Sequence, residues 1–66
     1  MTPADLRAIL KALDMSQLRL AQVLGVNPTT VRRWVQHKNA TPIPEPIARI
    51  LRLAAAGRIN LNELEQ

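Results

Sequence analysis

The sequence predicts an all-α fold, a compact bundle of four to five short helices. Three observations favour this class: aliphatic residues recur at helical spacing, prolines, glycines and capping residues divide the chain into short segments, and no segment alternates as a strand does. With one tryptophan and no phenylalanine or tyrosine among 66 residues, the core must be built mainly from Leu, Ile, Val and Ala. A chain of this length is expected to form a single domain, here residues 1–66.

The first helix is predicted over about residues 3–13. Thr2 is a good N-cap, Pro3 suits the first helical position, and Asp5 lies in the first turn, where a negative charge is favourable. The apolar residues that follow are spaced by three and four positions and should form the buried stripe, which consists of Leu6, Ile9, Leu10 and Leu13.

Two more short helices follow, separated by a tight turn. Ser16 is a plausible N-cap for a helix over about residues 17–24, and Gly25 ends it, because glycine adopts a left-handed conformation at little cost. Asn27 caps a third helix, over about residues 28–36, whose first position is Pro28. The buried positions are expected to be Leu20, Ala21 and Leu24 on one helix, and Val31, Trp34 and Val35 on the other.

A polar loop over residues 37–42 precedes the last part of the chain. Alternating prolines at 42, 44 and 46 oppose an earlier helix start, so the fourth helix is predicted over about residues 45–56, with Gly57 after it. Asn60 and Glu63 are spaced as a capping box for a short C-terminal helix over about residues 60–66. The inward positions of the fourth helix should be Ile47, Ile50, Leu51 and Ala54.

The junction of the second and third helices has the layout of a helix-turn-helix, in which two short helices meet at a glycine turn. Each core position requires a particular kind of residue. Ala21 must be small because the two helices cross there, Gly25 takes a positive φ, and Trp34 helps to fill the space between the two helices. The predicted core of the motif is Leu20, Ala21, Leu24, Gly25, Val26, Val31 and Trp34.

Residues 17–34 resemble the helix-turn-helix of phage repressors, Cro proteins and bacterial Xre-type DNA-binding domains, the lambda-repressor-like family. The match includes the Leu-Ala pair at 20–21, the Leu-Gly-Val turn at 24–26, and Val31 and Trp34 in the second helix of the motif. The layout of the flanking helices extends the likeness to about residue 56, whereas residues 57–66 carry no family motif. The resemblance implies a bundle of four or five helices that binds DNA.

The third helix is predicted to face the major groove. At 100° per residue, Val31, Trp34 and Val35 lie on one side, and Thr29, Arg33 and Gln36 lie on the other. Arg33 can donate two hydrogen bonds to a guanine, and Gln36 can pair with an adenine. Thr29 can offer its hydroxyl and its methyl group to a base edge. Pro28 offers only apolar contact, to a thymine methyl group. The resemblance independently implies base contacts at three of these positions, so the predicted base-contacting residues are Pro28, Thr29, Arg33 and Gln36.

Phosphate contacts are expected around this face. The start of the second helix presents free backbone amides that favour an anion, and the loop after the third helix carries donors. The predicted phosphate-contacting residues are Ser16, Gln17, Asn27, Thr30, Arg32, Lys38, Asn39 and Thr41.

The distribution of charge agrees with a polyanionic partner. The net charge is +4, and residues 27–58 carry six Lys and Arg against one Glu, a balance of +5. We therefore expect a homodimer that binds double-stranded DNA sequence-specifically at an operator-like site. It would act as a small transcriptional regulator of phage or bacterial type, a repressor. The alternative is a helical protein-interaction module of the same fold, such as an antitoxin or anti-repressor partner.

Other classes of function find little support. The chain has no cysteine, one histidine and one serine, so we expect no enzyme activity, no catalytic residues, no metal site and no cofactor. No apolar run approaches the length of about 18 residues that a membrane span needs, and the N-terminus lacks the pattern of a signal peptide. We expect a cytoplasmic, nucleoid-associated protein of a bacterial or phage-infected cell.

Overall fold

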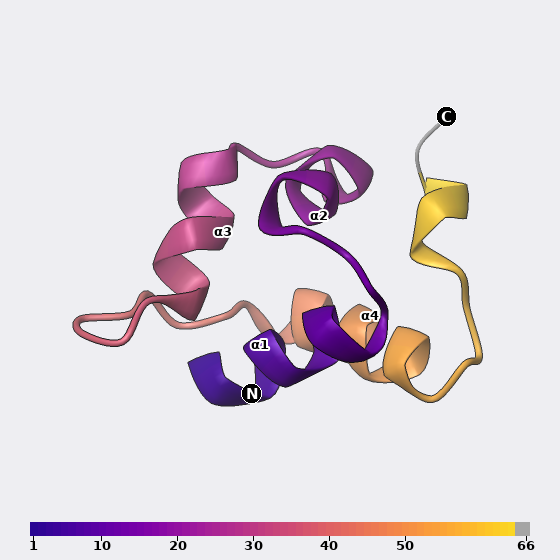
Figure 1. Cartoon of the computed structure of the whole chain (residues 1–66), viewed down its shortest axis with the longest axis horizontal. Helices are drawn as coiled ribbons and strands as arrows, with labels where there is room; N and C mark the ends of the chain where they lie inside the picture. The colour runs from indigo at the N-terminus through magenta and orange to yellow at the C-terminus, as the bar shows by residue number, and fades with distance from the viewer. Residues whose placement is uncertain (65–66) are drawn as a thin grey trace.

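A computed structural model describes residues 1–64 of the chain and contains four α-helices, followed by a single 3₁₀ turn (Figure 1). No strand occurs within this range, which confirms the predicted all-α class. The helices are α1 (Pro3–Ala12), α2 (Gln17–Leu24), α3 (Pro28–Val35) and α4 (Glu45–Ala55), and the 3₁₀ turn is η1 (Leu61–Leu64).

Side-chain caps explain where three of the helices begin. The Thr2 hydroxyl accepts a hydrogen bond from the Asp5 amide at 3.0 Å, and the Asp5 carboxylate accepts one from the Thr2 amide at 3.1 Å, which together form a capping box. Ser16 Oγ accepts from the Arg19 amide at 3.0 Å, and Asn27 Oδ1 accepts from the Thr29 amide at 2.8 Å. Each cap satisfies a backbone donor that has no partner within its own helix.

The C-terminal ends differ from the prediction by a residue in three helices. Leu13 is the C-cap of α1, Gln36 follows α3 in an extended conformation, and α4 ends before Ala56. α2 ends at Gly25, whose φ of 72° is the left-handed conformation expected for this turn. At the C-terminus, Asn60 Oδ1 accepts from the Asn62 amide at 3.0 Å, and helix is described only as far as Leu64, so the predicted positions 65–66 lie outside the described residues.

The core lies where the four helices meet. Leu6, Leu20, Val31 and Leu51 are fully buried, one from each of α1 to α4, and Trp34 is 3% exposed. The predicted buried positions need correction: Val23 and Ala48 are buried although neither belonged to the predicted stripes. Six residues that were predicted to be inward are only half-buried, namely Ile9, Leu13, Leu24, Val26, Ile47 and Ile50. Val23 is buried because η1 packs on α2 and covers a second side of that helix.

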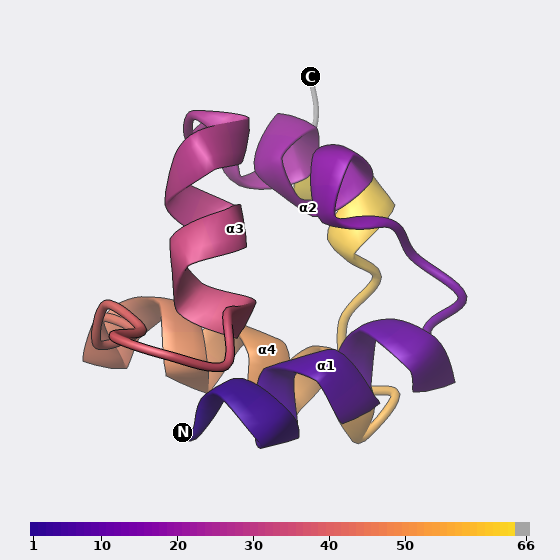
Figure 2. The ribbon, with the colours of Figure 1, turned by 60° about the vertical axis from the view of Figure 1, so that its left-hand side comes forward.

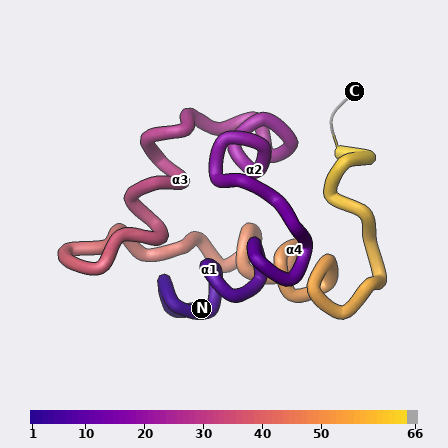
Figure 3. Tube along the Cα trace, in the orientation of Figure 1, coloured from indigo at the N-terminus to yellow at the C-terminus, as the bar shows by residue number. Residues whose placement is uncertain are grey.

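The arrangement places α3 upright between two layers. α1 and α4 lie side by side below it, and α2 crosses its upper end (Figure 2). After α4 the chain runs back toward α2, where η1 packs (Figure 3). α3 therefore contacts α1 and α2 on its inner side and leaves its outer side uncovered by another helix.

Two arginines join elements that are distant in sequence. Arg7 of α1 donates a hydrogen bond to the carbonyl oxygen of Val35, at the C-terminal end of α3, where a positive charge is favourable. Arg19 of α2 donates from Nε and Nη2 to Asn62 Oδ1, at 3.1 and 2.9 Å. These bonds fix α3 and η1 in place.

Candidate nucleic-acid interface

The outer side of α3 is polar and basic. Thr29, Arg32 and Arg33 are exposed, and Val31, Trp34 and Val35 on the opposite side are buried. Because the three buried side chains hold α3 against the bundle, the exposed ones are presented from a fixed backbone. This arrangement suits insertion into the major groove, which is wide enough to admit an α-helix.

The N-terminal ends of α2 and α3 lie together and form a groove of about 310 Å³, which we call the α2–α3 groove. It unites residues that are ten or more positions apart in the sequence, two from α2 and three from α3. Its lining consists of Gln17, Leu18, Pro28, Thr29 and Arg32.

Four of these five lining residues were predicted to contact DNA, and Leu18 was not. Leu18 lies outside the inward stripe of α2 and is 55% exposed. The only sequence pattern that could have pointed to Leu18 is a leucine on the outer face of a short amphipathic helix. Single exposed leucines are common on protein surfaces, so this pattern does not indicate a binding residue. Its proximity to Pro28 and Arg32 depends on how α2 crosses α3.

Gln36 is placed differently from the prediction. It follows the last residue of α3, and its Nε2 donates a hydrogen bond to the carbonyl oxygen of Asn39 at 2.8 Å. The amide group is thus engaged with the backbone of the next loop, and the side chain is half-buried. A base contact by Gln36 would require that this bond be exchanged.

The loop after α3 returns to the end of that helix. The Thr41 amide donates to the Arg33 carbonyl oxygen at 3.1 Å, and Asn39 takes a positive φ of 53°. Lys38, Asn39 and Thr41 are exposed on this loop. This loop follows the C-terminal end of α3, whereas the α2–α3 groove lies at its N-terminal end. The three residues therefore flank the exposed face of α3 at the end opposite to the groove.

The N-cap residues of α2 and α3 already use their side-chain oxygen atoms in hydrogen bonds. Ser16 Oγ and Asn27 Oδ1 accept hydrogen bonds from their own helices, which leaves the hydroxyl hydrogen of Ser16 and the amide hydrogens of Asn27 as donors. Donors are what a phosphate oxygen requires. Thr30 is half-buried, on the flank of α3.

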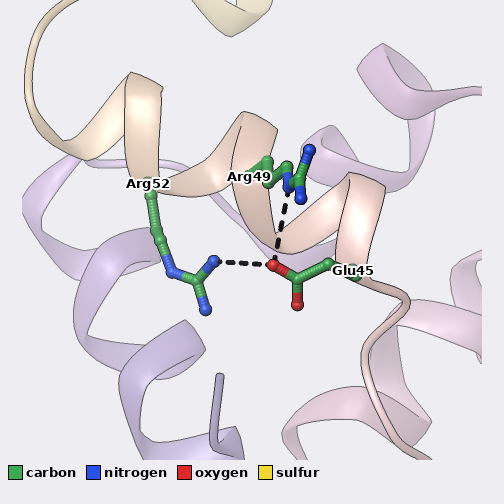
Figure 4. A network of polar contacts seen from close by, with 3 residues as sticks. All are labelled: Glu45, Arg49 and Arg52. Carbon is green, nitrogen blue, oxygen red and sulfur yellow. Dashed lines mark hydrogen bonds and ion pairs between the residues drawn. The ribbon is translucent and has the colours of Figure 1, made fainter.

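Two arginines of α4 pair with an acidic residue of their own helix. On α4, Glu45 Oε1 lies 3.1 Å from Arg52 Nη1 and 3.7 Å from Arg49 Nε (Figure 4). The hydrogen bond from Arg52 and the charges of both arginines hold the pKa of Glu45 below its ordinary value. Within residues 1–64, by contrast, no acidic side chain forms an ion pair with Arg32, Arg33 or Lys38, so the basic groups around α3 face solvent.

Residues 1–64 contain no cluster of three or more His, Cys, Asp or Glu side chains that could hold a metal ion. None of their helices has the length and apolar character that crossing a membrane requires.

Comparison with known proteins identifies one family. A model of the helix-turn-helix family matches residues 6–43, which is more than half of the chain and covers most of α1, all of α2 and α3, and most of the following loop. No curated protein and no solved structure matches the chain.

Proposed function

Because the chain belongs to the helix-turn-helix family of DNA-binding regulators, of Xre and lambda-repressor-like type, we propose that it binds double-stranded DNA in a sequence-specific manner and represses transcription. The observation that carries this proposal is the uncovered face of α3, with Thr29, Arg32 and Arg33 exposed on a helix that Trp34 anchors in the core. The proposed role is one of binding, with no catalytic step.

In this proposal the N-terminal part of α3 reads base edges. Arg33 bonds O6 and N7 of a guanine, Thr29 contacts a neighbouring base, and Pro28 meets a thymine methyl. Gln36 contributes less to base recognition, because its side-chain amide donates a hydrogen bond to the carbonyl oxygen of Asn39 in the loop.

Phosphate groups on either side hold the protein in register. Ser16 and Gln17 at the start of α2, and Asn27 and Thr30 at the start of α3, contact one strand, with Arg32 beside them. Lys38, Asn39 and Thr41 contact the backbone from the loop after α3. Such contacts position the protein without reading sequence.

A homodimer completes the proposal. Only three or four side chains of one recognition helix reach base edges, so a single copy reads few base pairs, and two copies on a two-fold operator would place their recognition helices about 34 Å apart. Apolar side chains that could form the contact are exposed on α4 and in the C-terminal segment, namely Leu53, Ile59 and Leu64. A dimer on an operator represses by blocking access to a promoter, in the cytoplasm of a bacterial or phage-infected cell, on its nucleoid.

Selection from a random duplex library tests the proposal. The expected result is a palindromic consensus with half-sites about one helical turn apart, bound with a Kd that weakens steeply as salt concentration rises. Recovery of no consensus from the folded wild-type protein would contradict sequence-specific binding, and a single asymmetric half-site would contradict the dimer.

One observation favours a second candidate, a protein-interaction module such as an antitoxin or anti-repressor partner. Leu53 on α4 is 41% exposed and lies in a shallow hollow that it shares with Ala56 and three arginines, Arg49, Arg52 and Arg58. An apolar group ringed by cations suits an acidic amphipathic partner. This candidate predicts that titration with random duplex at two salt concentrations shows no strongly salt-dependent binding.

A further inference from the structure

The α2–α3 groove contains an apolar side chain that the proposed phosphate and base contacts do not use. Leu18 is 55% exposed, more than the other large exposed hydrophobic residues of the described chain, Leu53, Ile59 and Leu64. It lines the groove together with Pro28, so the two residues give it an apolar wall formed from both helices. Phosphates bind cations and hydrogen-bond donors, so phosphate binding gives no reason for a leucine here.

The major groove of DNA offers one apolar group to such a wall. Of the four bases, thymine alone carries a methyl group, at C5, and presents it there beside hydrogen-bonding groups. Pro28 has no N–H, and its ring offers only apolar contact. Thr29, which lines the same groove, adds the methyl of its own side chain.

We infer that Leu18 and Pro28 form a receptor for a thymine methyl in the α2–α3 groove, so that α2 as well as α3 determines which sequence is bound. The inference rests on the proposed function and deepens it. Specificity at one position of the site then depends on burial of the methyl between two helices, and not on a hydrogen bond.

The other lining residues indicate DNA as the occupant. Arg32 is exposed, lines the same groove and has no acidic partner within residues 1–64, and Gln17 adds a donor at the start of α2. No acidic side chain lines the groove. A phosphate of the strand that carries the thymine would meet Arg32 while the methyl meets Leu18.

The experiment compares thymine with deoxyuridine, which lacks only the methyl. Each thymine of the consensus that the wild-type chain selects is replaced in turn, and Kd is measured for the wild-type protein, Leu18→Ala, Leu18→Met and Lys11→Ala. For the wild-type protein, one replacement per half-site should weaken binding about three- to tenfold, which corresponds to the burial of one methyl group. In Leu18→Ala that ratio should fall to about one.

The two other variants serve as controls. Leu18→Met keeps an apolar side chain of similar reach and should retain the ratio. Lys11→Ala removes an exposed side chain from α1, outside the groove, so the ratio should stay at the wild-type value. Because Leu18 is exposed, its variants should unfold at the wild-type temperature, which Trp34 fluorescence checks.

The outcomes separate this inference from the proposed function. If the wild-type protein selects a consensus but its deoxyuridine ratios are all about one, or are the same in Leu18→Ala, the methyl receptor is wrong and the proposed function stands. If the folded wild-type protein selects no duplex, both fail together.

Discussion

Neighbouring arginines on α3 differ in what surrounds them. Arg32 lines the α2–α3 groove with Pro28 and Thr29, whereas Arg33 is exposed outside that groove, one turn after Thr29. In the proposed complex, Arg32 is close to the phosphates that flank the start of α2, and Arg33, on the outer line of the helix, is placed to reach bases. We therefore expect phosphate binding from Arg32 and base recognition from Arg33.

Replacing Arg33 by alanine should relax discrimination at one base pair. The expected loss is about 1–3 kcal/mol for the preferred site, because a guanine loses two hydrogen bonds from one guanidinium. Library selection with the variant measures the change in consensus. Arg58→Ala is the matched control, because it removes the same charge from an exposed position beyond α4 and should leave the consensus intact. Wild-type specificity in Arg33→Ala would refute the assignment.

Replacing Lys38 by alanine should weaken binding to all duplexes alike. A lysine that neutralises one phosphate contributes about one to the slope of log K against log salt concentration, so the variant should have a slope smaller by about one. Titrations of a specific and a random duplex over a range of salt concentrations measure it. Lys11→Ala, on the exposed side of α1, is the control and should keep the wild-type slope. An unchanged slope in Lys38→Ala would remove Lys38 from the phosphate contacts.

At the scale of elements, the turn between α2 and α3 depends on one backbone conformation. Gly25 has a φ of 72°, and a Cβ built at this position would meet nothing within 4 Å. The requirement for glycine is therefore conformational and does not come from lack of space. The same turn sets the angle at which α3 leaves α2, and so the shape of the α2–α3 groove.

Gly25→Ala should lower the free energy of unfolding by about 1 kcal/mol, the approximate cost of holding an alanine in the left-handed region. Gly25→Asn should lose less, because asparagine tolerates this conformation better than alanine does. Urea unfolding followed by the fluorescence of Trp34, the only tryptophan of the chain, measures both. Gly57→Ala is a useful comparison, since Gly57 has a φ of 74° and equally open surroundings, and should lose a similar amount. Full stability of Gly25→Ala would contradict the conformational explanation.

At the scale of the molecule, stability should fall in acid. The amide and hydroxyl of Thr2 hydrogen-bond Asp5 and lower the pKa of its carboxyl group, and the hydrogen bond from Arg52 lowers the pKa of Glu45. Both groups thus release their protons more readily in the folded chain than in the unfolded one. Their contribution is present above the unfolded pKa values, about 4, and is lost as pH falls through the lower folded values.

The free energy of unfolding should accordingly be smaller at pH 3 than at pH 6. Urea unfolding at the two pH values tests this in the wild-type protein and in the double variant Asp5→Asn, Glu45→Gln, whose pH dependence should be reduced because neither replacement titrates. An equally steep dependence in the double variant would show that other groups are responsible.

The helices could be predicted from the sequence because the interactions that start and end them involve residues only a few positions apart. Thr2, Ser16 and Asn27 cap helices through bonds that span two or three positions, and Gly25 ends α2 by its own φ. The buried face of α3 follows from the spacing of Val31, Trp34 and Val35, and the exposure of Thr29 and Arg33 follows with it. Local hydrogen bonding and helical period are properties of the sequence alone.

Only the tertiary structure determined which residues far apart in the sequence come into contact. Arg7 reaches the carbonyl of Val35 across 28 positions, Arg19 reaches Asn62 across 43, and Leu18 meets Pro28 only because α2 crosses α3 near the start of each helix. Gln36 turns toward Asn39 because α3 ends before it and the loop folds back. No periodicity encodes these contacts, because they depend on the angles between helices, and those angles are set by the packing of the whole core.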